Sequence, residues 1–224
     1  MLAGVFRKGH ANSPSPATVA RRGRPRSFDR SAALLRALEL FWERGFEGTP
    51  VRELTEVMGV SAPSLYAAFG SKEELFREAV AYYNDPVRSP TARALADEPT
   101  ARRAVEAMLR ENALSYCDPA TPRGCLIVLS ATTYTPNSTG IRDLLADLRD
   151  RDRKALRIRL HRAVAEDELP ASVDTAALAA FVITVLHGLS IQARDGASTD
   201  ALSAAVDVAM LAWDAVVQRA HACR

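Results

Sequence analysis

The chain has 224 residues, of which 48% are hydrophobic and 25% charged, and its formal net charge is +2. That length can bury a sizeable core, and that balance is typical of a globular protein rather than a disordered one. The three cysteines have neither CxxC spacing nor nearby histidine pairs, which argues against a disulfide scaffold or a zinc site and fits a reducing compartment.

The sequence patterns also argue against an enzyme and a membrane protein. There is no glycine-rich phosphate loop, no metal-ligand spacing and no GxSxG motif, so we expect no catalytic residues, cofactor or metal. A Cys–His enzyme built from Cys125 and His161 or His187 is the weakest alternative, because no spacing favours either pair. No apolar run approaches the roughly 18 residues of a membrane span, and the N-terminus lacks the apolar core of a signal peptide. We therefore expect a cytoplasmic protein without a membrane partner.

The N-terminus is basic and polar. Residues 1–30 hold seven of the 29 Lys and Arg but one of the 27 Asp and Glu, so this segment carries +6 and the remainder −4. Residues 1–23 are rich in Ser, Pro, Gly and Ala without a hydrophobic period, which predicts a disordered arm. A basic arm on a mildly acidic body indicates contact with a polyanion, although such tails are also common as solubilising segments.

The next stretch of sequence predicts two short helices. Asp29 is a candidate N-cap of the first helix, which ends at Gly45. Thr49 is a candidate N-cap of the second, with Pro50 at its first position. The apolar side chains expected to face inward are Leu34, Leu35, Leu38, Phe41 and Trp42 in the first helix and Val51, Leu54, Val57 and Met58 in the second.

A tight turn at Gly59 leads to a third helix, and a fourth follows. Ser61 caps the third helix, which tolerates Pro63 in its first turn. Ser71–Glu74 has the pattern of a capping box and opens the fourth helix. Short helices joined by a glycine turn predict a helix-turn-helix unit.

Beyond residue 84 the chain predicts a larger helical unit. A polar stretch with three prolines marks the boundary, and helices are expected at about 100–117, 139–167, 174–194 and 200–219. The run CLIVLSATTY, which begins at Cys125, fits either a strand or a buried helix on its pattern alone. The last two helices are apolar nearly all round, so each needs cover on more than one side, and a second subunit would supply it.

The third helix has the composition of one that enters a DNA groove. Small polar residues at its start, namely Ser61, Ala62 and Ser64, are expected to face outward, where the backbone can approach base edges. The phenol of Tyr66 can bind phosphate. Lys72 stands at the start of the next helix, where free N–H groups favour an anion. The simpler interpretation is a helical corner with incidental polarity.

Three motifs occur together in residues 23–80: the basic GRPR segment, GFEGTPVRELTEVMGVS and PSLYAAFGSKEEL. Together they resemble the N-terminal domain of the tetracycline-repressor (TetR) family of transcriptional regulators. The resemblance implies an all-α fold, with an N-terminal three-helix helix-turn-helix domain and a larger helical ligand-binding and dimerisation domain. It also implies that CLIVLSATTY is helical and that the last two helices pair across a homodimer.

The resemblance implies DNA contacts for individual residues. Thr49 and Arg52 would lie at the groove edge, mainly against phosphate, with Tyr66 and Lys72 as phosphate clamps. The base-facing surface would comprise Ser61, Ala62, Pro63, Ser64 and Ala67, and Arg24 and Arg26 would reach the minor groove. Several positions in this helix are alanines where family members often carry larger groups. Specificity would then depend on thymine methyl groups, the arm or DNA shape.

The resemblance also implies a cavity for a small-molecule inducer in the C-terminal half. Residues that would give a mostly apolar lining are Met108, Asn112, Tyr116, Leu129, Thr133, Phe181 and Val185, although most of them equally fit a plain core. His187 either binds a ligand or, more commonly for such a residue, is a satisfied core or interface group. Asp152 is either a polar anchor in a pocket or, the favoured interpretation, the partner of Arg149 or Arg153.

We therefore expect three parts: a disordered basic arm (1–23), a helix-turn-helix DNA-binding domain (24–84) and a helical ligand-binding and dimerisation domain (85–224). The expected function is sequence-specific transcriptional regulation by a homodimer. It would act as a repressor that an unknown small-molecule inducer releases from a pseudo-palindromic site on double-stranded DNA. The alternative is a helical small-molecule or partner-binding protein without specific DNA recognition.

Overall fold

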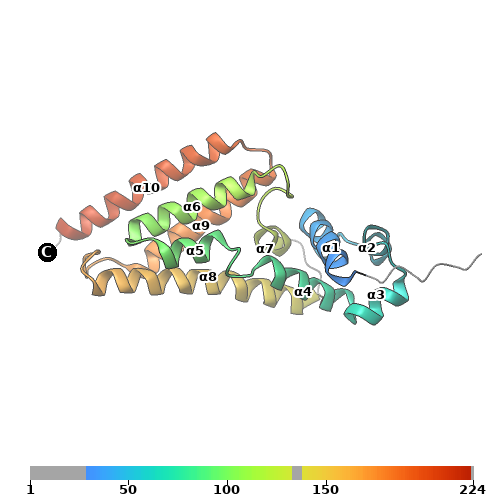
Figure 1. Cartoon of the computed structure of the whole chain (residues 1–224). Coiled ribbons are helices and arrows are strands. Elements are labelled where there is room, and N and C mark those ends of the chain that lie inside the picture. Colours follow the sequence, from blue (N-terminus) through green and yellow to red (C-terminus); the bar gives the residue numbers. More distant parts are fainter. Residues whose placement is uncertain (1–28, 133–137, 223–224) are drawn as a thin grey trace, which may run out of the picture.

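The computed structural model describes residues 29–132 and 138–222, and within these ranges every regular element is a helix. Figure 1 shows an elongated molecule with α1, α2 and α3 at one end and the C-terminal end of α10 at the other. The long helix α8 runs along one side, and α6 and α9 lie between α8 and α10. The all-α expectation is confirmed.

The N-terminal helices are α1 (Arg30–Arg44), α2 (Val51–Met58), α3 (Ala62–Phe69) and α4 (Lys72–Tyr83). The Asp29 carboxylate accepts the N–H of Ala32 at 3.0 Å, so the predicted cap of α1 is present. Phe41 and Phe76 pack edge to face with ring centroids 5.0 Å apart and are fully buried. These contacts hold α1 against α4.

The turn between α2 and α3 is the one expected of a helix-turn-helix. Gly59 adopts a left-handed conformation, with φ 68° and ψ 35°, which a glycine reaches without steric cost. Ser61 then caps α3 by accepting the N–H of Ser64 at 3.3 Å. Ser71 caps α4 in the same way through the N–H of Glu74 at 3.0 Å. The N–H of Ser71 donates to the carbonyl of Phe69, so the return bond of a full capping box is not the one formed.

Three predictions for α1 and α2 were wrong in detail. The N-cap position of α2 is held by Pro50, and the hydroxyl of Thr49 donates backwards to the carbonyl of Gly45 at 2.7 Å. Leu35 and Val57 are 38% and 40% exposed rather than buried. Each lies next to a buried apolar residue, and a 3.6-residue period turns only one of two such neighbours fully inward.

The C-terminal helices are α5 (Pro90–Asp97), α6 (Ala101–Tyr116), α7 (Leu126–Leu129), the 3-10 turn η1 (Ser130–Thr132), α8 (Thr139–Ala165), α9 (Thr175–Arg194) and α10 (Thr199–Ala222). Four of them lie where the hydrophobic period predicted helices. The run CLIVLSATTY is helical over its described part, as the family resemblance implies.

Helix α5 was not predicted, because the polar stretch with Pro86, Pro90 and Pro99 was interpreted as a boundary. Ser89 caps it through the N–H of Ala92 at 3.2 Å, and Pro90 occupies its first turn, where the missing N–H costs nothing. Thr91, Ala94 and Leu95 form its buried face.

Helix α9 contains an apolar stretch as long as a membrane span, so the expectation that no run in the sequence approaches that length was wrong. By length and composition it passes the test for a membrane span, with a mean hydropathy of 1.8 over the best 18 residues. Its contacts are instead those of a core helix, because it packs against α6, α8 and α10 and buries Leu178, Val182 and Leu186.

Two hydrophobic clusters organise the described residues. One joins α5, α6, α9 and α10 with the C-terminal half of α8. The other, around Phe41 and Phe76, also takes in residues from α7 and the start of α8, among them Leu126, Ile141 and Leu145. The helix-turn-helix region is thus packed directly on part of the C-terminal half. The division at residues 84 and 85 stays a prediction.

Candidate nucleic-acid interface and ligand cavity

Helix α3 presents a mostly small, polar outer face. Leu65 and Phe69 are 0% and 5% exposed and pack inward, as predicted. The outward residues expected to face DNA, all exposed except the half-buried Ala62, are Ser61, Ala62, Pro63, Ser64, Tyr66 and Ala67. With no long side chain among the first four, the backbone at the start of α3 can approach a groove closely.

The hydroxyl groups on this face differ in their freedom to bind a new partner. The Oγ atoms of Ser61 and Ser64 lie 2.8 Å apart and share a hydrogen bond, while Ser61 also caps the helix. Tyr66 is 47% exposed. Tyr66 is therefore the better placed of these groups for a phosphate oxygen.

Two cations flank this face. The side chain of Arg52 is 83% exposed, and its Nε lies 3.8 Å from a carboxylate oxygen of Glu56 one turn on, a loose surface pair. Lys72 is the first residue of α4, and its Nζ lies 4.3 Å above the ring centroid of Phe46. Burial lowers the pKa of Lys72, and the nearby Glu47 partly offsets that effect.

One of the predicted DNA contacts is buried, and two others fall outside the part of the chain that the structure describes. The side chain of Thr49 is completely buried and its hydroxyl is bonded to Gly45, so the expectation of a phosphate contact from that hydroxyl is wrong. Its role is to close the turn before α2. Arg24 and Arg26 lie outside the described residues.

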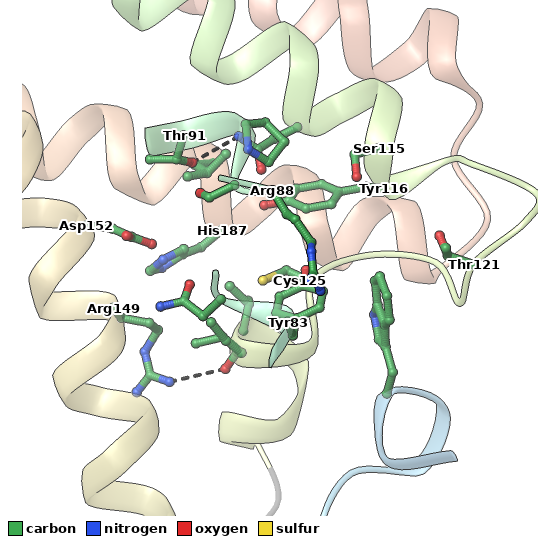
Figure 2. Close-up of a pocket in the computed structure, with 18 of the residues that line it drawn as sticks. Tyr83, Arg88, Thr91, Ser115, Tyr116, Thr121, Cys125, Arg149, Asp152 and His187 are labelled. Carbon is green, nitrogen blue, oxygen red and sulfur yellow. Dashed lines mark hydrogen bonds between the residues drawn. The ribbon is translucent and has the colours of Figure 1, made fainter. Parts of the chain in front are cut away.

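A cavity of about 310 Å³ opens where the helix-turn-helix region meets the C-terminal helices. Its walls come from α1, α4, α5, α6, α7, α8 and α9. Figure 2 shows side chains from these elements converging on one space. Its volume is at the lower end of the range for small-molecule sites.

Much of the cavity wall is aromatic. Trp42, Tyr82, Tyr83 and Tyr116 line it together with Cys125. Burial raises the pKa of Tyr83 and Tyr116 well above the usual range and also raises the pKa of the Cys125 thiol. All three groups are therefore neutral near pH 7 and act as hydrogen-bonding groups rather than charges.

Three ionisable side chains of the lining come from α8 and α9. Arg149 and Asp152 project from one face of α8, and His187 projects from α9 (Figure 2). Arg149 donates to the carbonyl of Ile127 at 3.4 Å. Within the described residues neither Asp152 nor His187 has a hydrogen bond or ion pair, so the favoured pairing of Asp152 with Arg149 or Arg153 is wrong. Arg153 pairs with Asp150 instead.

The environment of these groups shifts their titration. Burial raises the pKa of Asp152 to about 6. Burial lowers the pKa of His187, and the positive charge of Arg149 lowers it further. Burial also lowers the pKa of Arg149. At neutral pH the three groups are thus mainly an anion, a neutral imidazole and a cation.

Two of the seven predicted ligand residues line this cavity, and the ligand contacts themselves stay a prediction. Asn112 and Tyr116 line the cavity. Met108 is buried in the core, Phe181 is 39% exposed, Leu129 lines a separate small pocket, and Val185 is outside the lining. Thr133 lies outside the described residues.

The residues that sequence reasoning missed come mainly from the first helices and from α8. Trp42 and Tyr83 were counted as helix core, and Arg88 lay in a stretch taken for a boundary. The available signal was polar residues in otherwise inward positions. Asp152 on the seam of α8 and His187 in the apolar α9 show this signal most clearly, and the sequence had already marked both as possible ligand contacts.

Hydrogen bonds join α1 to the C-terminal half of the chain beside the cavity. The indole Nε1 of Trp42, on α1, donates to the carbonyl of Gly124 at 3.0 Å in the segment before α7. Arg194, at the end of α9, donates to the carbonyl of Glu43 near the end of α1. These two hydrogen bonds join α1 directly to the segment before α7 and to the end of α9.

An apolar surface remains on the outside of α9 and α10. Its large exposed members are Phe181 (39%), Ile191 (41%), Val208 (66%), Leu211 (69%) and Val216 (47%). By contrast, no group of three or more His, Cys, Asp or Glu side chains suited to a metal ion occurs in residues 29–132 and 138–222.

Comparison with known families gives two matches along the chain. Residues 33–79 match the model described as "Bacterial regulatory proteins, tetR family". Residues 100–210 match the model described as "Tetracyclin repressor-like, C-terminal domain". The first match contains α2 and α3, and the second contains most of the elements that line the cavity.

Curated relatives include two named repressors from Escherichia coli (strain K12). The HTH-type transcriptional repressor ComR is 34% identical over 198 residues, which cover 88% of this chain and 94% of ComR. The HTH-type transcriptional repressor BdcR is 30% identical over 187 residues, covering 84% and 90% of the two chains.

Solved structures of similar chains are also TetR family regulators. A cysteine mutant of the TetR family regulator CifR, complexed with 26-base-pair operator DNA, is 46% identical with a TM-score of 0.81. The match covers 85% of this chain and all of that one. A TetR regulator from Rhodococcus sp. RHA1 is 37% identical with a TM-score of 0.56, covering 80% and 96%.

Proposed function

Because the chain belongs to the TetR family of DNA-binding transcriptional regulators, which are not enzymes, we propose that it is a cytoplasmic repressor released from its operator by a small molecule. Two copies bind a pseudo-palindromic site, and the inducer occupies the cavity behind the helix-turn-helix region. The alternative of a binding protein without specific DNA recognition is not favoured by relatives that are named repressors.

The DNA-binding part of the proposal rests on α3. Each subunit lays the outer face of α3 in a major groove, with the two grooves separated by about one helical turn or a multiple of it. Ser61, Ser64 and Ala67 face base edges, while Tyr66 and Lys72 bind phosphates on either side. Because these base-facing side chains are short, thymine methyl groups and DNA shape carry much of the selectivity.

The dimer part rests on the apolar surface of α9 and α10. Val208 and Leu211 are 66% and 69% exposed in the single chain, on the same helix, α10, that buries Val206, Ala209 and Met210 on its other side. Burying such residues in water-excluding contact is favourable by about 25 cal/mol per Å² of apolar surface. A second copy placed on the same two helices gives an isologous interface and a two-fold axis that matches a palindrome.

The observation that carries the release mechanism is the composition of the cavity wall. Leu38 and Trp42 on α1 and Tyr82 and Tyr83 on α4 line it together with residues of α6 to α9. A ligand that fills the cavity therefore touches the helices that carry α2 and α3. It favours a spacing of the two α3 helices that does not fit the operator, so by linkage operator and inducer weaken each other's binding.

The test is fluorescence anisotropy with the purified full-length protein and DNA fragments from beside its own gene. A scrambled fragment of equal length is the control, and both are titrated over a salt series. We expect tight binding that prefers a native fragment. Weak binding that ignores sequence and fades steeply with salt would count against the proposal. If fragments selected from the whole genome gave the same result, the proposal would be contradicted.

A further inference from the structure

We infer that the ligand of this cavity is a small uncharged molecule with an apolar ring or chain and one hydroxyl group, which hydrogen bonds between Asp152 and the Arg149–His187 side of the wall. This inference rests on the proposed function of the cavity as the inducer site. It adds the chemical class of the ligand, which follows from the volume, the wall and the charges of the cavity.

The volume and the wall define the body of the ligand. A cavity of about 310 Å³ accommodates a small molecule rather than a large cofactor. Trp42, Tyr83, Tyr116, Ile127 and Leu186 give it a largely aromatic and aliphatic surface. Such a surface binds an apolar ring or chain favourably and provides few hydrogen-bonding partners for a sugar or a nucleotide.

The charges of the wall make an uncharged ligand the best fit. Arg88 also lines the cavity; it stacks on the ring of Tyr82 at 3.8 Å and lies 3.6 Å from a carboxylate oxygen of Asp85, which offsets part of its charge. The remaining charges, Arg149 and Asp152, cancel each other. The tyrosines, the thiol and the imidazole are neutral, because burial shifts each of their pKa values in that direction.

A charged ligand would face a like charge wherever it bound near these groups. A carboxylate held by Arg149 would lie on the same face of α8 as Asp152, one turn away. An ammonium ion held by Asp152 would lie against Arg149 in the same way. Both arrangements are penalised in a partly buried site, where Coulomb energies are larger than in water.

A hydroxyl group satisfies both sides at once. It donates to the Asp152 carboxylate, which has no partner within the described residues, and its oxygen accepts from Arg149 or His187. Hydrogen bonds to charged groups are stronger than neutral ones, and a partly buried carboxylate without a partner gains most from such a bond. An apolar molecule of the same shape leaves these groups as they are.

The experiment uses four probes that share an ethylphenyl body and differ in the group opposite the ethyl chain: 4-ethylphenol, ethylbenzene, 4-ethylbenzoate and 4-ethylbenzylamine. Each is titrated by calorimetry into the full-length protein near neutral pH, up to its solubility. We expect 4-ethylphenol to bind at least about tenfold more tightly than each of the others, as a charge-assisted hydrogen bond predicts. Tighter binding of the acid or the amine, or no binding by any probe, would overturn the inference.

Two variants test whether Asp152 and Arg149 determine the selectivity among the probes. Asp152→Asn should weaken 4-ethylphenol binding several-fold and improve 4-ethylbenzoate binding. Arg149→Gln should instead favour 4-ethylbenzylamine. The matched control is Asp147→Asn, which lies exposed on the same helix and outside the cavity and should leave all four affinities unchanged.

Unchanged probe selectivity in both folded cavity variants would refute the assignment. Its failure is separable from that of the proposed function, because operator binding is measured on the same protein without any probe. If the protein binds its operator but 4-ethylphenol is not the tightest-binding probe, the proposed function stands and this ligand class is ruled out.

Discussion

Asp152 is a carboxyl group in a place that favours its neutral form. Burial raises its pKa to about 6, and within the described residues no cation pairs with it. In the unfolded chain its pKa returns to the ordinary value near 4. Between these two values the folded protein binds more protons than the unfolded one, so this group lowers stability as the pH rises through that window.

Asp152→Asn should therefore stabilise the protein at neutral pH. We expect a gain of about 1–3 kcal/mol in the free energy of unfolding near pH 7.5, shrinking towards zero near pH 4 as the wild-type carboxyl becomes protonated in both states. Urea unfolding followed by circular dichroism at several pH values measures it. An equal difference at about pH 5 and 7.5 would show that the carboxyl is not held in its neutral form.

The two proposed phosphate contacts differ in charge, and salt separates them. Lys72→Ala should weaken binding to operator and scrambled DNA alike and lower the slope of log affinity against log salt by about 1 for each phosphate that the lysine no longer neutralises. Tyr66→Phe should weaken binding several-fold, also for both DNAs, with the slope unchanged because the phenol carries no charge. Anisotropy titrations over a salt series measure both.

The matched control for Tyr66→Phe is Tyr82→Phe. Tyr82 is 37% exposed and lies on α4 rather than on α3. It should leave the affinity for DNA unchanged in the absence of a ligand. An effect of Tyr82→Phe equal to that of Tyr66→Phe would remove Tyr66 from the DNA-binding surface.

At the scale of elements, two glycines in turns have different requirements. Gly59, between α2 and α3, has φ 68° but open space where a Cβ would lie. Gly124, in the segment before α7, has φ 81°, and its Cβ would lie 2.7 Å from the carbonyl oxygen of Ser190. The first turn needs only the left-handed backbone, whereas the second also needs the missing side chain.

Gly59→Ala should cost about 1 kcal/mol, the strain of a left-handed alanine. Gly124→Ala should cost about 3 kcal/mol or more, because backbone atoms of α9 cannot move aside as a flexible side chain can. Urea unfolding of both variants measures the difference. Equal costs would mean that the segment around Gly124 does not pack against α9 as closely as described.

Most helices were predictable because their signals are local. Asp29 and Thr100 cap α1 and α6, and the hydrophobic period marks α8 to α10. Helix α5 was missed because Ser89 and Pro90 equally fit a loop. The cavity was mostly missed for a different reason. Its wall joins Trp42 on α1 to His187 on α9, and no local pattern records which helices meet.

At the scale of the whole molecule, the proposed dimer interface is the exposed apolar surface of α9 and α10. Leu211 is 69% exposed in the single chain, so its replacement by a charged residue has little effect on the fold of one subunit. In a dimer that buries it, the same replacement places an unpaired charge in an apolar interface, which is strongly unfavourable.

Leu211→Asp should therefore convert a dimer into a folded monomer and weaken operator binding far more than binding to a single half-site. The matched control is Ile158→Asp, because Ile158 is 71% exposed on α8 and outside the proposed interface. Analytical ultracentrifugation gives the mass, and anisotropy with full and half operators gives the affinities. A Leu211→Asp protein that stays dimeric with full operator affinity would place the two-fold axis on another surface, and the cavity would then have to act on the α3 spacing by another route.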